Sequence, residues 1–258
     1  MNKQNIQEAL SHYRNHLKAS GQNITPKEIE KGIRCVLFDM DGVLYNSMPN
    51  HAIAWTNCMK KFGIRMTAAD AYATEGARGI DTIRSFAKRQ LNKDLSLEEA
   101  QQMYDVKTDY FHQLPVAEIF PGVIELMRKI KASGVDIGVV TGSGQRPLIQ
   151  RLLRDFGEFF NETHIVTAYD VNRGKPNPDP YLMGLKKCGH YLPWQGIVVE
   201  NAPLGVRSGV AAGIFTVAVN SGPLPDSALQ REGADLVYEK MTQFCDDWDT
   251  LMVSSGKL

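Results

Sequence analysis

The stretch CVLFDMDGV at residues 35–43 joins a run of four apolar residues to two carboxylates, Asp39 and Asp41, and a glycine, Gly42. An uninterrupted apolar run is typical of a strand buried on both faces of a parallel sheet. In open α/β sheets ligands bind at the carboxyl ends of strands, so both carboxylates are expected in a crevice. Gly42 would let the backbone turn tightly behind them. The alternative is an ordinary strand followed by an Asp-Gly turn, and this stretch alone does not decide between the two.

The composition is that of an ordinary globular protein, and its 258 residues suffice for one large domain or two smaller ones. The 29 Lys and Arg residues balance 29 Asp and Glu residues, so no overall field would attract nucleic acid or a membrane surface. The four cysteines form no CxxC pair and are predicted to be reduced packing residues. The polar N-terminus lacks an apolar signal segment and no stretch approaches about 18 apolar residues, so we expect a cytoplasmic protein.

Two segments have helical character and flank the first strand. Residues 1–31 are polar and are predicted to contain an amphipathic helix, because four apolar residues recur at spacings of four, three and four: Ile6, Leu10, Tyr13 and Leu17. Residues 47–118 are rich in Ala, Lys, Gln and Glu and poor in β-branched runs. We therefore predict an N-terminal helical extension over residues 1–31 and an inserted helical domain over residues 47–118.

Strand and helix signals alternate after residue 119. Pro121 as the first helical residue and Gly134 at the end frame one helix. Later helices are expected at residues 146–156, 180–189 and 205–213. Strands are expected at residues 135–140, 164–166, 197–199, 215–219 and 234–238. This alternation implies right-handed crossovers and a parallel sheet. The predicted fold is α/β, with a Rossmann-like doubly wound core at residues 32–46 and 119–258.

Polar residues also follow the second strand of this core. Thr141, Gly142 and Ser143 come directly after the apolar residues of that strand. Their hydroxyls and backbone amides could bind an anion such as phosphate at the start of the next helix. The alternative is a plain turn with a helix cap.

Two further motifs follow later strands. Lys175 lies in a proline-rich loop and could neutralise a phosphate as a point charge, although a solvated loop lysine is the simpler interpretation. Glu200 and Asn201 could offer oxygen ligands to a hard cation, or could instead cap a helix. Accidental polar residues would scatter over both ends of the sheet. All of these fall at one edge, which favours a functional site.

The order of these residues resembles the four motifs of the haloacid dehalogenase superfamily of phosphotransferases: Asp39-x-Asp41, Thr141, Lys175 and Glu200-Asn201. Within it the chain resembles the β-phosphoglucomutase-like branch, in which a helical cap is inserted after the first motif. The resemblance covers residues 33 to about 240. The N-terminal helix lies outside it.

The resemblance implies a role for each motif. Asp39 would be the nucleophile that forms an aspartyl phosphate, and Asp41 the general acid and base. The attack of a carboxylate on a phosphate dianion requires a cation, and Mg²⁺ is implied, held by four residues: Asp39, Asp41, Glu200 and Asn201. The phosphoryl oxygens would be held by a second set: Thr141, Gly142, Ser143 and Lys175.

One departure from the family pattern concerns the metal site. Family members usually carry a second acid where this chain has Asn201. Asparagine keeps a carbonyl oxygen that can coordinate a cation but removes a negative charge. We therefore expect weaker Mg²⁺ binding than in a relative that bears the acid.

The resemblance also points to cap residues. His51 occupies a position like that of a substrate-facing histidine, or alternatively is a partly buried hinge residue. Arg78 could grip a second phosphate, although it is shifted by one position from the mutase arginine. Glu75 stands where mutases tend to have lysine, and Lys107 is a second basic candidate. A mutase must hold a bisphosphate at both ends, so these departures favour hydrolysis.

Three functions are consistent with the sequence. The first is a Mg²⁺-dependent phosphatase for small phosphorylated metabolites such as sugar phosphates. The second is β-phosphoglucomutase, which interconverts β-glucose 1-phosphate and glucose 6-phosphate, and the third is a non-catalytic binding protein on the same fold. The expected partner is a small phosphorylated metabolite, with no nucleic acid or membrane, and the expected assembly is a monomer or weak homo-oligomer.

Overall fold

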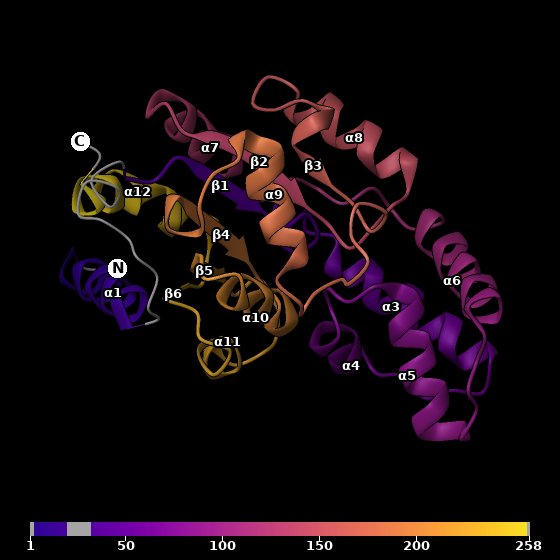
Figure 1. Ribbon diagram of the computed structural model, residues 1–258. Coiled ribbons are helices and arrows are strands. Elements are labelled where there is room, and N and C mark those ends of the chain that lie inside the picture. The colour runs from indigo at the N-terminus through magenta and orange to yellow at the C-terminus, as the bar shows by residue number, and fades with distance from the viewer. Residues whose placement is uncertain (1–2, 20–31, 257–258) are drawn as a thin grey trace.

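The computed structural model describes residues 3–19 and 32–256, and its centre is a six-stranded parallel sheet (Figure 1). The strand order is β3-β2-β1-β4-β5-β6. The strands are β1 Cys35–Phe38, β2 Asp136–Val140, β3 Ile165–Val166, β4 Gly196–Glu200, β5 Phe215–Val219 and β6 Leu236–Tyr238. This topology confirms the predicted doubly wound α/β core. It also places the CVLF run in the middle of the sheet, between β2 and β4.

Helices cover both faces of the sheet, and the buried residues of β1 divide between them. Val36 and Phe38 belong to the large cluster that includes helices α7 and α12, whereas Cys35 and Leu37 pack in the cluster under helix α9. The helices of the core are α7 Val123–Ala132, α8 Arg146–Phe156, α9 Asp179–Gly189, α10 Pro203–Ala211, α11 Asp226–Gln230 and α12 Met241–Ser255. β1 is covered on both faces. The polar residues that follow it, Asp39 and Asp41, therefore lie beyond its carboxyl end, where the chain leaves the buried sheet.

Four helices follow β1 and gather beside the carboxyl edge of the sheet, at the right of Figure 1. They are α3 Met48–Lys61, α4 Ala68–Ala73, α5 Gly79–Leu91 and α6 Leu97–His112. They share a hydrophobic cluster of their own, with Trp55, Met59, Ile83 and Phe86 among its buried members. We propose that these helices form the cap predicted over residues 47–118.

The predicted N-terminal helix is present as α1, Lys3–Ala19. Its four apolar residues are all buried, as expected from their spacing: Ile6, Leu10, Tyr13 and Leu17. The helix packs on α12, and Tyr13 donates a hydrogen bond to the backbone oxygen of Gly213 at 2.7 Å. Residues 1–2 and 20–31, the rest of the predicted extension, lie outside the described residues. Helix α12 was missed by the sequence analysis.

Several predicted element ends are wrong by one or two residues. Helix α7 begins at Val123 and not at Pro121, because Gly122 adopts a left-handed conformation with φ 89° before the first helical turn. Helix α10 begins at Pro203, two residues before the predicted start. In the described part of the chain no helix is long and apolar enough to cross a membrane. The four cysteines are free and buried, which confirms their packing role.

Candidate active site

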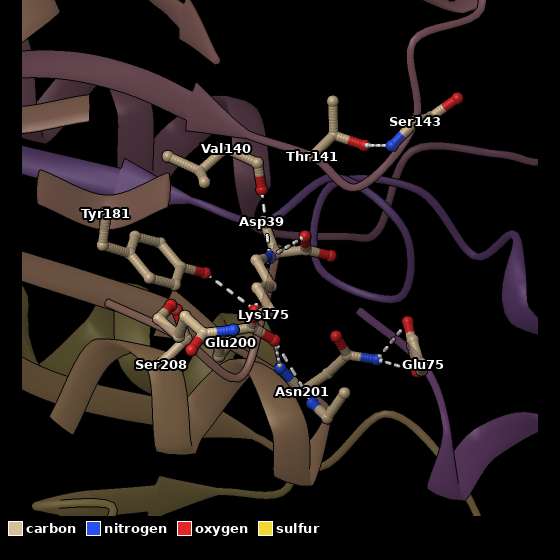
Figure 2. A network of polar contacts seen from close by, with 12 residues as sticks. Asp39, Glu75, Val140, Thr141, Ser143, Lys175, Tyr181, Glu200, Asn201 and Ser208 are labelled. Atoms are coloured by element: carbon tan, nitrogen blue, oxygen red, sulfur yellow. Dashed lines mark hydrogen bonds and ion pairs between the residues drawn. The ribbon is translucent and has the colours of Figure 1, made fainter. Parts of the chain in front are cut away.

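The carboxyl ends of three neighbouring strands bring the predicted catalytic residues together (Figure 2). Phe38 pairs with Val139 on one side and with Val199 on the other, so the next residue, Asp39, lies between the ends of β2 and β4. Asp39 is buried, with 4% of its surface exposed. The register of the sheet therefore sets the nucleophile candidate beside Thr141 and Glu200.

Lys175 occupies the centre of this group and is itself buried. Its Nζ donates hydrogen bonds to Asp39 Oδ1 at 2.5 Å, to Glu200 Oε1 at 2.7 Å and to the backbone oxygen of Val140 at 3.1 Å. Burial opposes the charge of Lys175, but the two carboxylates raise its pKa above the ordinary value. Lys175 is therefore not a solvated loop lysine, which was the simpler interpretation of its place in the sequence.

At Asp39, the effects that raise the pKa outweigh the attraction of Lys175, which lowers it. Burial raises the pKa of Asp39 to about 7 although Lys175 lowers it, because Glu200 and Asp41 add like charge nearby. Ionised Asp39 is therefore costly in this site unless further positive charge is supplied. A divalent cation would supply that charge.

Glu200 was predicted as a metal ligand, and the structure favours a different role. Its Oε1 accepts hydrogen bonds from Lys175 and from the Tyr181 hydroxyl at 2.7 Å, while its Oε2 faces the backbone amides of Asn201 and Ala202 at 2.9 and 3.3 Å. Both carboxylate oxygens are thus used by donors of the protein. We assign Glu200 to holding Lys175 in place. Tyr181, 19 residues upstream, was not singled out from the sequence.

Asn201 contacts a cap residue that the sequence analysis did not place in the site. Its Nδ2 donates to both carboxylate oxygens of Glu75 at 2.9 Å, which joins the segment between β4 and α10 to the loop after helix α4 (Figure 2). Burial and the neighbouring Asp39 raise the pKa of Glu75 well above its usual value. A Cβ at Gly42 would come within 2.0 Å of Asn201 Nδ2, so Gly42 leaves the space for this contact.

These groups fit the hard cation that the family resemblance implies. Asn201 Oδ1 is buried and has no hydrogen-bond partner among the described residues. An unpartnered amide oxygen beside Asp39 and Glu75 is the type of donor that Mg²⁺ prefers. In the described residues no group of three or more His, Cys, Asp or Glu side chains is arranged to hold a metal ion. A cation at this site would therefore need oxygen ligands other than carboxylates, and the amide oxygen of Asn201 is one.

Asp41 projects toward the cap and is held there by two groups. Its Oδ1 accepts a hydrogen bond from Ser47 Oγ at 2.6 Å and lies 3.1 Å from His51 Nε2. Burial would raise the pKa of Asp41, but the attraction of His51 and these hydrogen bonds lower it to about 2. Ser47, at the start of helix α3, was not singled out from the sequence.

His51 is in turn held by a buried lysine from helix α6. Lys107 Nζ lies 2.7 Å from His51 Nδ1 and is surrounded by the rings of Trp55, Tyr104 and Phe111 at 4.9 to 5.7 Å. Burial lowers the pKa of Lys107 to about 8. The predicted cap residues His51 and Lys107 are therefore brought together, in a chain that ends at Asp41.

A small cavity of about 70 Å³ lies where the cap meets the carboxyl edge of the sheet. Seven of the predicted site residues line it: Asp39, Asp41, His51, Lys107, Thr141, Gly142 and Ser143. Thr141 Oγ1 accepts a hydrogen bond from the Ser143 amide at 3.0 Å, so the Thr141 hydroxyl binds a backbone amide of its own loop. Glu75 and Tyr104 also line the cavity.

Arg78, the residue predicted to grip a second phosphate, is bound by two groups of the protein. Its Nε donates to Asp81 Oδ2 at 2.7 Å and its Nη1 to the backbone oxygen of Asn172 at 3.0 Å. Among the described residues that line the cavity, Arg78 is absent. Arg78 is shifted by one position from the mutase arginine, and its guanidinium turns toward a loop of the core, where it binds Asn172.

The fold is a doubly wound α/β sheet with acidic, hydroxyl and lysine side chains gathered at the carboxyl ends of its central strands, and comparisons with known proteins identify the family. The profile of the family described as "Haloacid dehalogenase-like hydrolase" matches residues 36–219. The chain belongs to this family, and it is an enzyme.

Individual relatives extend this match over most of the chain. Hexitol phosphatase A of Escherichia coli is 33% identical over 215 residues, which are 82% of this chain and 94% of that protein. Beta-phosphoglucomutase of Bacillus subtilis is 25% identical over 227 residues, covering 84% and 96%. A solved structure described as "Putative beta-phosphoglucomutase from Bacteroides vulgatus" has a TM-score of 0.89 and 44% identity, and covers 98% of this chain and 99% of that one.

Proposed function

We propose that the protein is a Mg²⁺-dependent phosphatase that hydrolyses small phosphorylated metabolites such as sugar phosphates through a phosphorylated Asp39. The observation that carries this proposal is the position of Asp39 at the end of β1. There Lys175 binds one of its oxygens, and the Thr141 loop lines the cavity in front of it. The name of the hexitol phosphatase relative supports the substrate class.

The protein groups divide the reaction between them. Asp39 attacks phosphorus, while Lys175 and the Thr141 loop hold the phosphoryl oxygens. Asp41 protonates the leaving oxygen and then takes a proton from the attacking water. The pKa of about 2 favours the basic form of Asp41 that the second step needs and opposes the protonated form that the first step needs. When bound, Mg²⁺ would supply the positive charge that offsets repulsion between Asp39 and the phosphate, held by Asp39, the Asp41 carbonyl, Asn201 and Glu75. Glu75 differs from Glu200 in that its two oxygens share one donor, Asn201 Nδ2, whereas those of Glu200 accept from four donors, including Lys175.

Hydrolysis is favoured over mutase activity by the cap loop. A mutase must hold a bisphosphate, and the cation predicted for its second phosphate, Arg78, is bound to Asp81 and Asn172 instead. The cavity contains the carboxylate of Glu75, which would repel a second phosphoryl group. β-Phosphoglucomutase activity remains the second candidate, supported by the names of two relatives.

One assay separates the two activities. The purified protein is supplied with Mg²⁺, β-glucose 1-phosphate and a catalytic amount of β-glucose 1,6-bisphosphate. We expect release of inorganic phosphate, and no glucose 6-phosphate beyond the amount that the added bisphosphate yields. Accumulation of glucose 6-phosphate in excess of the bisphosphate would establish the mutase instead. A panel of sugar and polyol monophosphates, assayed for phosphate release, then identifies the preferred leaving group.

The contact between Asn201 and Glu75 gives a prediction for Asn201→Asp. The change places a carboxylate against Glu75 at about the present 2.9 Å, and two ionised carboxylates at that distance repel unless a cation lies between them. Without Mg²⁺ we expect the Tm to fall by about 2–4 °C, as for a loss of about 1 kcal/mol. With Mg²⁺ we expect the loss to be recovered and the Mg²⁺ requirement for activity to fall.

The control for this prediction is the double variant Asn201→Asp/Glu75→Gln, which removes the repulsion and should restore the Tm in Mg²⁺-free buffer. Differential scanning calorimetry with and without Mg²⁺ measures both effects. An Asn201→Asp protein whose Tm does not respond to Mg²⁺ more strongly than the wild type would show that Asn201 does not face the cation.

A further inference from the structure

The loop that joins helices α4 and α5, residues 74–78, touches core loops beside the cavity. A Cβ at Gly142 would come within 3.1 Å of the Gly76 oxygen, and one at Gly76 within 3.3 Å of Lys175 Cδ. A Cβ at Gly174 would come within 2.8 Å of Arg78 Cγ. Glycine on both sides of this contact therefore lets the two backbones come close together. The loop touches the phosphate-loop candidate and the loop of Lys175.

Arg78 makes the hydrogen bond that joins this loop to the segment between β3 and α9. The acceptor is the backbone oxygen of Asn172, 94 residues away in the sequence. Asp81, in the first turn of α5, accepts from Arg78 Nε and so holds the guanidinium in the orientation that reaches Asn172. Arg78 is therefore tied to its own helix and to the core at once.

Glu75 lies three residues before Arg78 and is bound at the other end of the same loop. Its carboxylate accepts two hydrogen bonds from Asn201 Nδ2, at the start of the segment that leads into α10. The loop is consequently fixed to the core at two points, by Glu75 on one side and Arg78 on the other. Arg78 is 36% exposed at its side chain, whereas Glu75 points into the buried site.

We propose that Arg78 is a positioning residue: with Asp81 and the Asn172 carbonyl it latches the cap loop to the core, and so places the Glu75 carboxylate beside Asn201. This inference rests on the proposed function only where Mg²⁺ is concerned. The latch itself is a contact between two parts of the chain. It gives Arg78 a function that does not require a second phosphate on the substrate.

Hydrogen–deuterium exchange tests the latch without any turnover. Arg78→Ala should accelerate amide exchange in peptides that cover residues 74–79 and 170–175, and Asp81→Asn should do so to a smaller extent. The matched control is Arg84→Ala. Arg84 lies in α5, the helix that begins directly after Arg78, and its Nε binds the backbone oxygen of Leu95 in the cap rather than the core. Unchanged exchange in Arg78→Ala would overturn the proposal.

The Mg²⁺ dependence of phosphate release tests the consequence for Glu75. The concentration of Mg²⁺ at half-maximal activity should rise by roughly twofold to fivefold in Arg78→Ala, since a partly exposed ion pair contributes little more than that. Arg78→Lys should recover part of the effect, and Arg84→Ala should match the wild type. If Arg78→Ala instead leaves the Mg²⁺ midpoint unchanged and raises KM only for bisphosphates, Arg78 is a substrate ligand and the proposal fails.

The two proposals fail in different ways. A wild-type protein that releases phosphate from no monoester would contradict the proposed function, yet the exchange experiment would still decide whether Arg78 latches the loop. Conversely, normal hydrolysis together with unchanged exchange would contradict only the latch.

Discussion

Replacing Asp39 with asparagine is expected to lower the rate of phosphate release by a factor of about 1,000 or more, because the neutral amide lacks the carboxylate oxygen that the proposed mechanism uses to attack phosphorus. The protein should remain folded. Asparagine keeps the oxygen that accepts the hydrogen bond from Lys175, and it removes a carboxylate that lies close to Glu200 and Asp41. Steady-state phosphate release and rapid-quench trapping of phosphorylated protein measure the loss.

The matched control is Asp136→Asn. Asp136 begins β2 at the opposite edge of the sheet and accepts a hydrogen bond from the Tyr191 hydroxyl at 2.5 Å. It should keep full activity. If Asp39→Asn retained more than about a tenth of the wild-type rate, or still formed a phosphorylated protein, the nucleophile would have to be another residue.

Lys175→Met is expected to destabilise the fold as well as abolish activity. Lys175 is the shared donor to Asp39 and Glu200, and its side chain is buried. Its removal leaves two carboxylates without their counter-charge, and breaking a buried ion pair in this way typically costs about 3–5 kcal/mol of unfolding free energy. Urea denaturation followed by circular dichroism at pH 7.5 measures the change.

The effect of Lys175→Met should depend on pH with a defined sign. Carboxylates left unpaired in the folded protein have a pKa above the value of about 4 that they have when unfolded, so the folded variant binds the extra protons. Its stability is then highest at low pH and falls as pH rises through the raised pKa. The difference from the wild type should accordingly be larger at pH 8 than at pH 5.

Two controls accompany this measurement. Lys187→Met removes a lysine whose partner, Asp170, is 2.6 Å away but about a quarter exposed, and should cost less than about 1 kcal/mol. The double variant Lys175→Met/Glu200→Gln removes one of the two carboxylates that Lys175→Met leaves without a counter-charge. It should therefore be more stable than Lys175→Met alone. A single variant as stable as Lys187→Met would mean that the buried carboxylates are not ionised in the wild type.

Much of the fold could be predicted because the relevant signals are local. All four residues of the CVLF run are buried, as in a central strand. The Asp-Gly pair after the run marks the point where the chain leaves the buried sheet. The N-terminal helix was predicted from the period of four apolar residues. Helix α12 was missed although its buried residues follow the same period: Phe244, Trp248, Leu251 and Met252.

The candidate site was predictable only along the strand ends. A parallel sheet aligns the carboxyl ends of its strands, so the order of polar residues after each strand is enough to bring Asp39, Thr141 and Lys175 together. Hydrogen-bond partners were not predictable in this way. Glu200 and Asn201 are adjacent in the sequence, yet one binds Lys175 and the other binds Glu75.

The α/β class, the central strand and the edge at which the carboxylates gather could therefore be predicted from the amino-acid sequence, because they follow from the spacing of apolar residues and from the glycines, prolines and polar residues between them. The residues that reach that edge from the inserted helices are known only from the folded structure. Glu75 meets Asn201 across 126 residues, and Lys107 meets His51 across 56. Such contacts depend on how the helices between β1 and α7 pack on the sheet. That packing is the sum of many long-range contacts and leaves no local pattern in the chain.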